Sequence, residues 1–249
     1  MEQLGRWRDI VLDGARISRG ATVADVGAGT GLLTLGAVER VGPDGDVLAF
    51  DISVDALEEL RALTLAPNIS YLIGSADLLP LPDSTVDAVM TRSVLIYVAD
   101  KAEAAREFAR VLSAGGRVSL FEPLNSRNLK LTDALDFSQL GDLGERVRAW
   151  NDSAHANRED PMLNFDVADL TGAFEDAGLA DVRVELGVTE ESIEGGRYLN
   201  QVGAPGRPTV LERWREAFAP DEVERLTAFV EDRLVPSRVE HVFLTARKP

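Results

Sequence analysis

Short apolar runs alternate with amphipathic segments along the first half of the chain. Five runs rich in β-branched residues predict strands at 22–26, 47–51, 69–73, 86–91 and 117–121. Most of them are separated by apolar residues at helical spacing, and a further amphipathic segment containing Leu4, Trp7 and Val11 precedes the first run. Strands that alternate with helices predict a parallel sheet covered by crossover helices.

The pattern changes after Pro123. Residues 124–163 are polar and only patchily helical, and residues 189–238 contain a glycine-rich loop and two amphipathic helices, the second with an apolar face that runs from Val223 to Leu234. Between and after these segments the strand pattern returns. We therefore expect one domain over residues 1–249, with a core at 1–123, 164–188 and 239–249 and two insertions at 124–163 and 189–238.

This organisation predicts an α/β fold. The expected core is a doubly wound, mostly parallel sheet with an antiparallel last strand, and the two insertions are helical. Insertions that leave the chain after the last strands are placed to cover the edge where ligands of open α/β sheets bind. We expect them to form a lid over the acceptor, with apolar walls from Phe137, Trp150 and Trp214. The alternative is a widened core or the interface of a homodimer.

Charge and composition exclude several functions. The 26 Lys and Arg residues against 42 Asp and Glu residues give a net charge of −16, which repels nucleic-acid backbones and anionic membranes. A local basic patch containing Arg106, Arg110 and Arg117 is the alternative to this global inference. The chain contains no cysteine, which excludes thiolate metal sites, and no apolar run long enough to span a bilayer, so a cytoplasmic protein is expected.

A glycine loop connects the first predicted strand to the next helix. Gly27, Gly29 and Gly31 leave backbone N–H groups open to a ligand. The dinucleotide fingerprint requires its third glycine at position 32, where this chain has Leu32. An NAD(P)-dependent oxidoreductase is therefore the less favoured interpretation of the loop.

The segment from Asp25 to Gly31, Asp-Val-Gly-Ala-Gly-Thr-Gly, resembles the first motif of class I S-adenosylmethionine (SAM)-dependent methyltransferases. The resemblance implies a Rossmann-like methyltransferase fold with a loop wrapped around the methionine part and ribose of SAM. Its residues are Gly27, Ala28, Gly29, Thr30 and Gly31. Asp25 would approach the ammonium group of SAM, and the alternative is that it stabilises the loop.

Asp51 ends the second predicted strand, twenty positions after Gly31. A carboxylate at that edge can accept hydrogen bonds from both ribose hydroxyls. The alternative is a cap for the following helix, a role that Ser53 can already fill. Asp51 and the adjoining Ile52 are therefore predicted to bind the cofactor.

Two later segments extend the resemblance. Residues 74–82 are similar to the third motif of the family, so Ser75, Ala76 and Asp77 are expected near the adenine ring, and Arg92 and Ser93 follow the fourth strand at the same edge. Residues 115–123 resemble a strand of quinone-biosynthesis methyltransferases. The Asn/Asp-Pro-Pro-aromatic signature of base and glutamine methylation is absent here, as is the Asp of metal-dependent catechol enzymes, so no metal is expected.

The predicted reaction is in-line transfer of the methyl group of SAM to a small-molecule acceptor, with S-adenosylhomocysteine as product. Alignment of the two reactants can supply the catalysis, so the catalytic residues stay undetermined. Four residues are candidates for a base, each with a structural alternative: Glu122, Tyr97, His155 and His241. A catalytically silent SAM-binding protein is the other interpretation of the same sequence.

Overall fold

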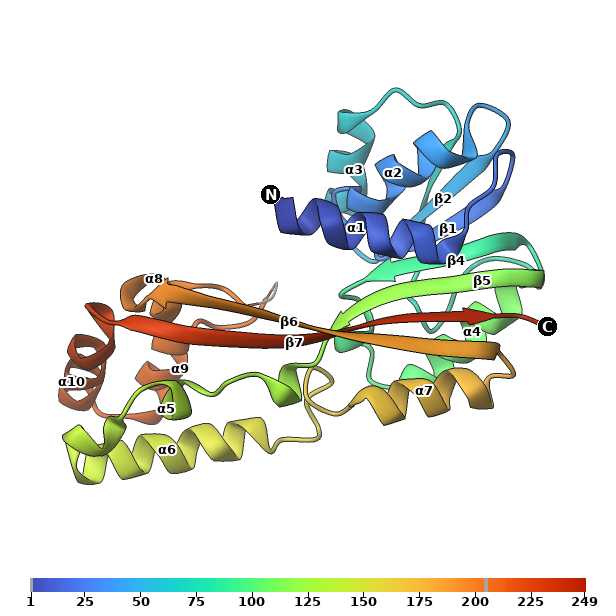
Figure 1. Ribbon diagram of the computed structural model, residues 1–249. Coiled ribbons are helices and arrows are strands. Elements are labelled where there is room, and N and C mark those ends of the chain that lie inside the picture. Colours follow the sequence, from blue (N-terminus) through green and yellow to red (C-terminus); the bar gives the residue numbers. More distant parts are fainter. Residues whose placement is uncertain (1, 204–205) are drawn as a thin grey trace. The chain divides into compact units, whose positions relative to one another are not determined.

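The predicted alternation of strands and helices is present in the computed structural model, which describes residues 2–203 and 206–249 (Figure 1). The first four strands are β1 (Thr22–Val26), β2 (Asp46–Asp51), β3 (Ile69–Ile73) and β4 (Val86–Arg92). The helices around them are α1 (Glu2–Ala15), α2 (Leu32–Val41), α3 (Val54–Leu63), the 3₁₀ turn η1 (Leu95–Tyr97) and α4 (Lys101–Val111). Within the described ranges, no helix has the length and apolar content needed to cross a membrane.

Seven strands form one sheet in the order β3-β2-β1-β4-β5-β7-β6. The last three strands are β5 (Leu112–Pro123), β6 (Ala180–Glu194) and β7 (Leu234–Arg247). The pairs from β3 through β5 are parallel, whereas β7 pairs with β5 in the antiparallel direction. The predicted Rossmann-like sheet, mostly parallel with an antiparallel last strand, is confirmed.

The strand order reverses at β1, which has β2 on one side and β4 on the other. Ligands of open α/β sheets bind outside the carboxyl ends of the strands at such a point. Apolar residues of α1 and α2 pack on one face of the sheet, and those of α4 and α7 (Val167–Asp176) pack on the other. Because the helices cover the two faces of the sheet and not its edge, we expect the site at the carboxyl ends of β1 and β2.

The described residues fall into two compact units. Unit 1 is Met1–Leu124, Arg158–Gly187 and His241–Pro249, and unit 2 is Asn125–Asn157 and Val188–Glu240. The residue ranges of unit 2 nearly coincide with those of the two predicted insertions, 124–163 and 189–238. The helical elements of unit 2 are η2 (Asn125–Arg127), α5 (Leu131–Ala134), η3 (Phe137–Leu140), α6 (Asp142–His155), α8 (Gly195–Asn200), α9 (Val210–Ala217) and α10 (Pro220–Glu231).

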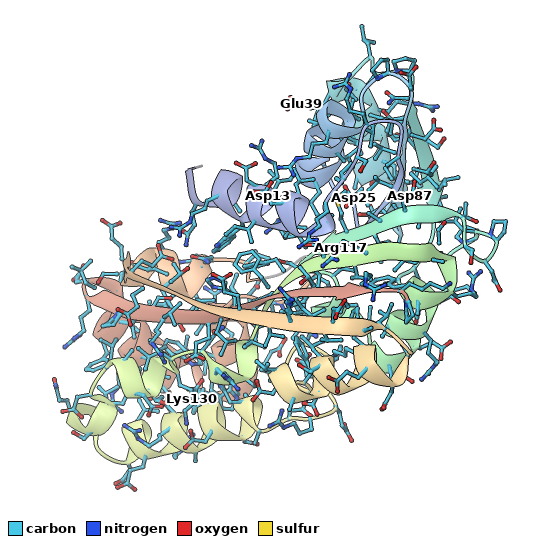
Figure 2. All side chains as sticks on the ribbon, turned by 45° about the vertical axis from the view of Figure 1, so that its right-hand side comes forward. Asp13, Asp25, Glu39, Asp87, Arg117 and Lys130 are labelled. Carbon is cyan, nitrogen blue, oxygen red and sulfur yellow. The ribbon has the colours of Figure 1, made fainter. Side chains whose placement is uncertain are left out.

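Unit 2 has its own hydrophobic core. Phe137 and Trp214 have no exposed surface, and the Phe137 and Phe229 ring centroids are 4.9 Å apart. The lid hypothesis predicts that Phe137 and Trp214 form an open apolar wall, but both are buried and stabilise the core of unit 2 instead. Trp150, the third residue of the predicted wall, is half-buried. Lys130 ties the start of α5 to α6 through an ion pair with Asp152 (Figure 2).

Several element boundaries differ from the sequence prediction. The predicted helix ending at Leu234 ends at Glu231 instead, and Leu234 begins β7 with 64% of its surface exposed. β6 likewise continues through residues 189–194, which were assigned to the insertion. Both strands are stabilised by their place in the sheet, next to partners distant in sequence, which local spacing of apolar residues does not reveal.

Candidate functional site

The glycine loop lies at the carboxyl end of β1, immediately before α2. Gly27, Gly29 and Gly31 have φ values of +71°, +52° and +93°, a region that favours glycine. The Ala28 N–H donates to the carbonyl oxygen of Phe50 at 2.8 Å, which joins the loop to the end of β2. The backbone conformation that the sequence predicted for this loop is therefore present.

Asp51 holds the same loop from β2. Its Oδ2 accepts a hydrogen bond from the Gly29 N–H at 2.8 Å, and its Oδ1 accepts one from the Ser53 N–H at 2.9 Å. The cap of α3 is made by Ser53, whose Oγ accepts from the Ala56 N–H at 3.2 Å, so Asp51 is not needed for that role. A Cβ built on Gly29 would meet no atom within 4 Å, so the space beside the loop is open.

Asp25 is buried beneath the loop, with 1% of its surface exposed (Figure 2). Its Oδ2 accepts a hydrogen bond from the Thr34 hydroxyl at 2.5 Å, which ties β1 to α2, while its Oδ1 has no hydrogen-bond partner among the described residues. Burial raises the pKa of Asp25 to about 6. A buried carboxylate with one oxygen unsatisfied favours a cationic neighbour, and the contact with an ammonium group stays a prediction.

The segment after β3 brings polar and apolar groups to the same edge. The Ser75 hydroxyl donates to Asp77 Oδ1, so these two side chains are coupled, and Ala76 is buried next to them. Three large apolar side chains here are exposed by 75%, 63% and 74%; they are Ile52, Ile73 and Leu78. Ile73 pairs with Asp51 in the β2–β3 register. Of these three residues the sequence predicts only Ile52 at the cofactor, because apolar residues at the end of a strand resemble buried core residues in a linear pattern.

Arg92 is the last residue of β4, and Ser93 follows it in the turn that contacts β5. The Ser93 N–H donates to the Phe121 carbonyl oxygen at 2.8 Å, and Ser93 has a φ of +56°. Arg92 is half-buried, and this burial lowers its pKa, although the charges of Glu122 and Asp25 act in the opposite direction. The cationic side chain of Arg92 thus lies in the electrostatic range of both buried carboxylates.

Glu122 organises the turn after β4. Its Oε1 accepts hydrogen bonds from the N–H groups of Val94 and Leu95, both at 2.9 Å, and its Oε2 accepts from Ile96 at 3.2 Å. Its side chain is fully buried, and burial raises its pKa to about 7. A Cβ on Gly27 would lie 2.2 Å from Val94 Cγ2, so this turn also packs against the glycine loop. Both oxygens of Glu122 are occupied by backbone N–H groups, so Glu122 positions the turn after β4 rather than contacting a ligand.

A buried lysine that the sequence analysis missed anchors the same turn. Lys101 Nζ donates to the carbonyl oxygens of Val98 and Pro161, both at 2.7 Å, and to Asn164 Oδ1. It also lies 4.7 Å from the centre of the Phe165 ring. Burial lowers the pKa of Lys101 to about 8. A lysine at the start of a helix is ordinarily predicted to be solvent-exposed, so the sequence around Lys101 does not indicate that it is buried.

An aromatic cluster lies between α1, β5 and β7. The rings of Trp7 and Phe121 are stacked with centroids 4.5 Å apart, and the His241 ring lies 5.3 Å from Trp7 and 5.1 Å from Phe121. His241 is 4% exposed, and a Cβ on Gly187 would lie 2.2 Å from its Nε2. These contacts favour the packing alternative for His241 over the role of base.

The two remaining base candidates differ in exposure. His155 is half-buried at the end of α6, where its Nδ1 lies 3.0 Å from the Asn151 carbonyl oxygen. Tyr97 is 44% exposed, which makes the core alternative for this residue wrong. Tyr97 is the most exposed of the four candidates.

Comparison with known proteins places this geometry among methyltransferases. Residues 24–120 match the model of a family described as "Methyltransferase domain". The ubiquinone/menaquinone biosynthesis C-methyltransferase UbiE of Enterobacter sp. (strain 638) is 34% identical over 183 residues, which cover 71% of this chain and 73% of that protein.

Solved structures show the same fold at lower sequence identity. The YcgJ protein of Bacillus subtilis superposes with a TM-score of 0.63 at 16% identity, covering 98% of both chains. A geranyl diphosphate methyltransferase solved in complex with SAM gives a TM-score of 0.55 at 16% identity, covering 98% of this chain and 85% of that one. At these identities the likeness concerns the fold alone.

Proposed function

The chain belongs to the class I SAM-dependent methyltransferases, and from this premise we propose that it methylates a small molecule at the carboxyl edge of the unit 1 sheet. One observation carries the proposal: the carboxylate of Asp51 and the glycine loop are joined through the Gly29 N–H at 2.8 Å. This pair lies beside the point where the strand order reverses, where ligands of such sheets bind.

The residues at this edge fit SAM. The buried carboxyl group of Asp25, with one oxygen unsatisfied, places negative charge beneath the loop where it attracts the ammonium group. The open space beside Gly29 suits the ribose and methionine part, and Asp51 suits the ribose hydroxyls. Ile52, together with the exposed side chains of Ile73 and Leu78, supplies apolar surface for the adenine ring. When bound, SAM supplies a methyl group already activated by its sulfonium.

We assign a planar, largely apolar ring to the acceptor. The partly exposed ring of Trp7 offers a flat aromatic surface and is held in place by stacking on the buried ring of Phe121. Phe121 adjoins the cofactor edge because its carbonyl oxygen accepts a hydrogen bond from the Ser93 N–H. The relatives are named for C-methylation in ubiquinone and menaquinone biosynthesis, which supports an acceptor of this kind.

The residues of this chain then act mainly by binding and orientation. Glu122 and Lys101 keep the turn after β4 in place, and the aromatic cluster excludes water from the acceptor side. Tyr97 is the candidate to form a hydrogen bond with an acceptor hydroxyl, because it is the most exposed of the four titratable candidates.

Calorimetry with SAM and with NADH, followed by a methyl-transfer screen, tests the proposal. We expect SAM to bind, NADH not to bind, and labelled methyl to pass to phenols or quinols rather than to amines. Trp7→Ala is expected to raise KM for the acceptor while leaving the Kd of SAM unchanged, with Leu65→Ala, at a fully exposed apolar position, as the control that changes neither. SAM binding without transfer to any acceptor would instead identify a silent SAM-binding protein.

A further inference from the structure

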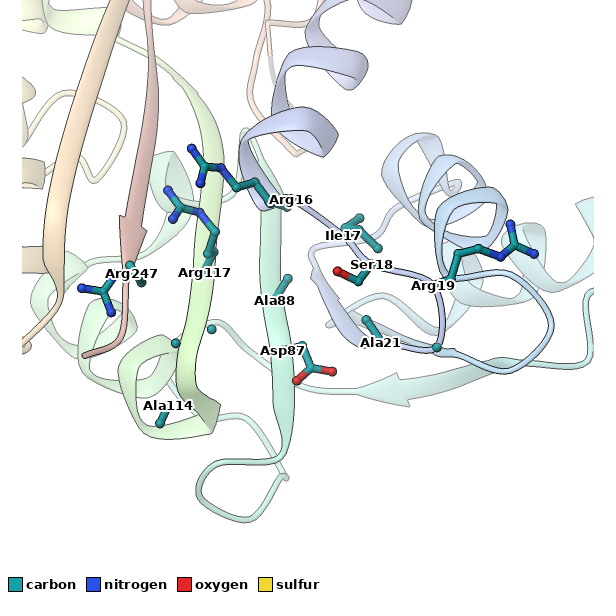
Figure 3. A pocket seen from close by; sticks show the side chains of 14 residues that line it. Arg16, Ile17, Ser18, Arg19, Ala21, Asp87, Ala88, Ala114, Arg117 and Arg247 are labelled. Carbon is teal, nitrogen blue, oxygen red and sulfur yellow. The ribbon is translucent and has the colours of Figure 1, made fainter.

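A cavity lies at the amino-terminal edge of the unit 1 sheet, opposite the edge that we assign to the cofactor. Its volume is about 620 Å³, and it is bordered by the α1–β1 loop, the start of β4, the turn at the start of β5 and the end of β7 (Figure 3). The polar and charged residues that line it are Arg16, Ser18, Arg19, Asp87, Arg117 and Arg247. None of the predicted cofactor-binding residues borders this cavity.

Like charges gather here although the chain carries a net charge of −16. The side chains of Arg16, Arg117 and Arg247 lie next to one another, whereas Arg19 points away toward α2 (Figure 3). Burial lowers the pKa of Arg117, and the charges of Arg16, Arg183 and Arg247 lower it further, while the charge of Asp181 acts in the opposite direction. Cations held this close repel one another, so the arrangement is costly without an anion.

The nearby acids do not neutralise the cluster. Asp181 pairs with Arg247 at 3.0 Å, and Asp87 accepts a hydrogen bond from the Thr22 N–H at 2.9 Å. Among residues 2–203 and 206–249, neither Arg16 nor Arg117 has a carboxylate oxygen within 4.0 Å. The polar contact of Arg117 is a long one, from Nε to the Gly14 carbonyl oxygen at 3.4 Å.

Of the basic patch suggested by the sequence, only Arg117 belongs to this cluster. Arg106 pairs with Glu103, and Arg110 pairs with Asp83 at 2.9 Å and Glu107 at 2.7 Å, so both are neutralised on α4. Arg117 instead joins Arg16 from the end of α1 and Arg247 from the last strand.

We propose that this cavity binds a small molecule that carries a phosphate group. Guanidinium groups bind phosphate oxygens through two parallel hydrogen bonds, and the neighbouring guanidiniums of Arg16 and Arg117, neither of which has a carboxylate partner among the described residues, provide such donors. The volume lies within the roughly 300–1,000 Å³ of small-molecule sites, so it admits an organic group as well as the phosphate. The net negative charge of the chain disfavours a polyanion such as nucleic acid.

Calorimetry with inorganic phosphate and with glycerol 3-phosphate tests the proposal. We expect saturable binding to the wild-type chain, weakened at least about tenfold in Arg16→Gln/Arg117→Gln and also weakened by raising the salt concentration. Arg8→Gln/Arg106→Gln, which removes two paired surface arginines, should bind as the wild type does. Tighter binding of glycerol 3-phosphate identifies an organic phosphate as the ligand, and equal binding identifies free phosphate.

Thermal unfolding gives a readout that does not depend on binding strength alone. Without phosphate, Arg117→Gln should raise the melting temperature, because it removes a repelled charge. Phosphate should stabilise the wild type and the Arg8→Gln/Arg106→Gln control, and should stabilise Arg16→Gln/Arg117→Gln much less. The proposal is overturned by absence of saturable binding at about 10 mM of either probe, or by equal loss in the control variant. SAM affinity is measured in parallel, and a change in SAM affinity alone would not count as support.

Discussion

The backbone N–H of Gly29 donates to the carboxylate of Asp51 across 22 positions of the chain, at 2.8 Å. The hydrogen bond couples the shape of the glycine loop to the end of β2, so the two parts of the predicted cofactor site are set by one contact. Asp51 therefore has two roles in our proposal, as a ligand of the ribose and as a support of the loop that surrounds it.

Replacing Asp51 with alanine should weaken SAM binding by about 2 kcal/mol or more, which is roughly 30-fold in Kd, because a charged hydrogen-bonding partner is lost. Calorimetric titration of the folded variant measures this loss. Asp55→Ala, on the exposed start of α3, is the matched control and should bind SAM normally. Unchanged affinity in Asp51→Ala would remove Asp51 from the cofactor site.

Gly29→Val should abolish SAM binding while the fold persists. Gly29 has a φ of +52°, which a β-branched residue strongly disfavours, and its missing side chain leaves the space open that we assign to the cofactor. Gly178→Val is a close control, since Gly178 has a φ of +82° and open space around it at the end of α7. Both variants are checked by circular dichroism, and tight SAM binding by Gly29→Val contradicts the loop assignment.

The free energy of unfolding should depend on pH through Glu122. Burial raises its pKa from 4.5 to about 7, so the folded state holds a proton that the unfolded chain releases earlier. The stability that this proton provides is complete below pH about 4.5 and is lost as pH rises through about 7, on the order of 3 kcal/mol in total. Asp25, with its pKa raised to about 6, adds a change of the same sign.

Glu122→Gln should flatten this decline, as measured by melting temperature between pH 4.5 and 8. The pKa of Glu107 is lowered, chiefly by its hydrogen bond to Arg110, so the stability it provides is lost at acid pH instead. Glu107→Gln should therefore leave the decline toward neutral pH in place. Parallel pH profiles for wild type and Glu122→Gln would show that Glu122 does not titrate in this range.

The lid hypothesis for residues 124–163 and 189–238 is tested by hydrogen exchange. S-adenosylhomocysteine, alone or with an acceptor, should increase protection in 124–163 and 189–215 if these residues cover the reacting groups. The buried core around Phe137 and Trp214 is expected to be protected from the start, so the informative peptides are those outside it. Protection confined to the glycine loop would place the acceptor elsewhere.

The sequence predicted what depends on residues near one another in the chain. The glycine loop lies within a few positions of β1, and its conformational requirements appear directly as glycines. Asp51 was recognised because a strand end is visible in the apolar pattern. Both predictions rest on local rules that hold regardless of how distant segments pack.

What the sequence left out depends on strand register. Glu122 meets the N–H groups of Val94 to Ile96 because β4 and β5 pair with Arg92 opposite Phe121. The cluster of Arg16, Arg117 and Arg247 likewise forms only when α1, β5 and β7 come together. Glu122 lies 26–28 positions from these N–H groups, and the three arginines lie a hundred or more positions apart, so both groupings are beyond the reach of local spacing rules.

The order of the strands also constrains how the sheet folds during synthesis of the chain. β7 contains the last residues of the sheet to be synthesised, yet it lies between β5 and β6 and not at an edge. Until it leaves the ribosome, β5 has an unpaired side and β6 lacks its neighbour in the sheet, so two strand edges stay open to wrong pairing. Removing β7 should therefore make the protein aggregate, although β7 contributes no residue to the predicted cofactor site. The aggregated fraction of the truncated chain after centrifugation measures this effect.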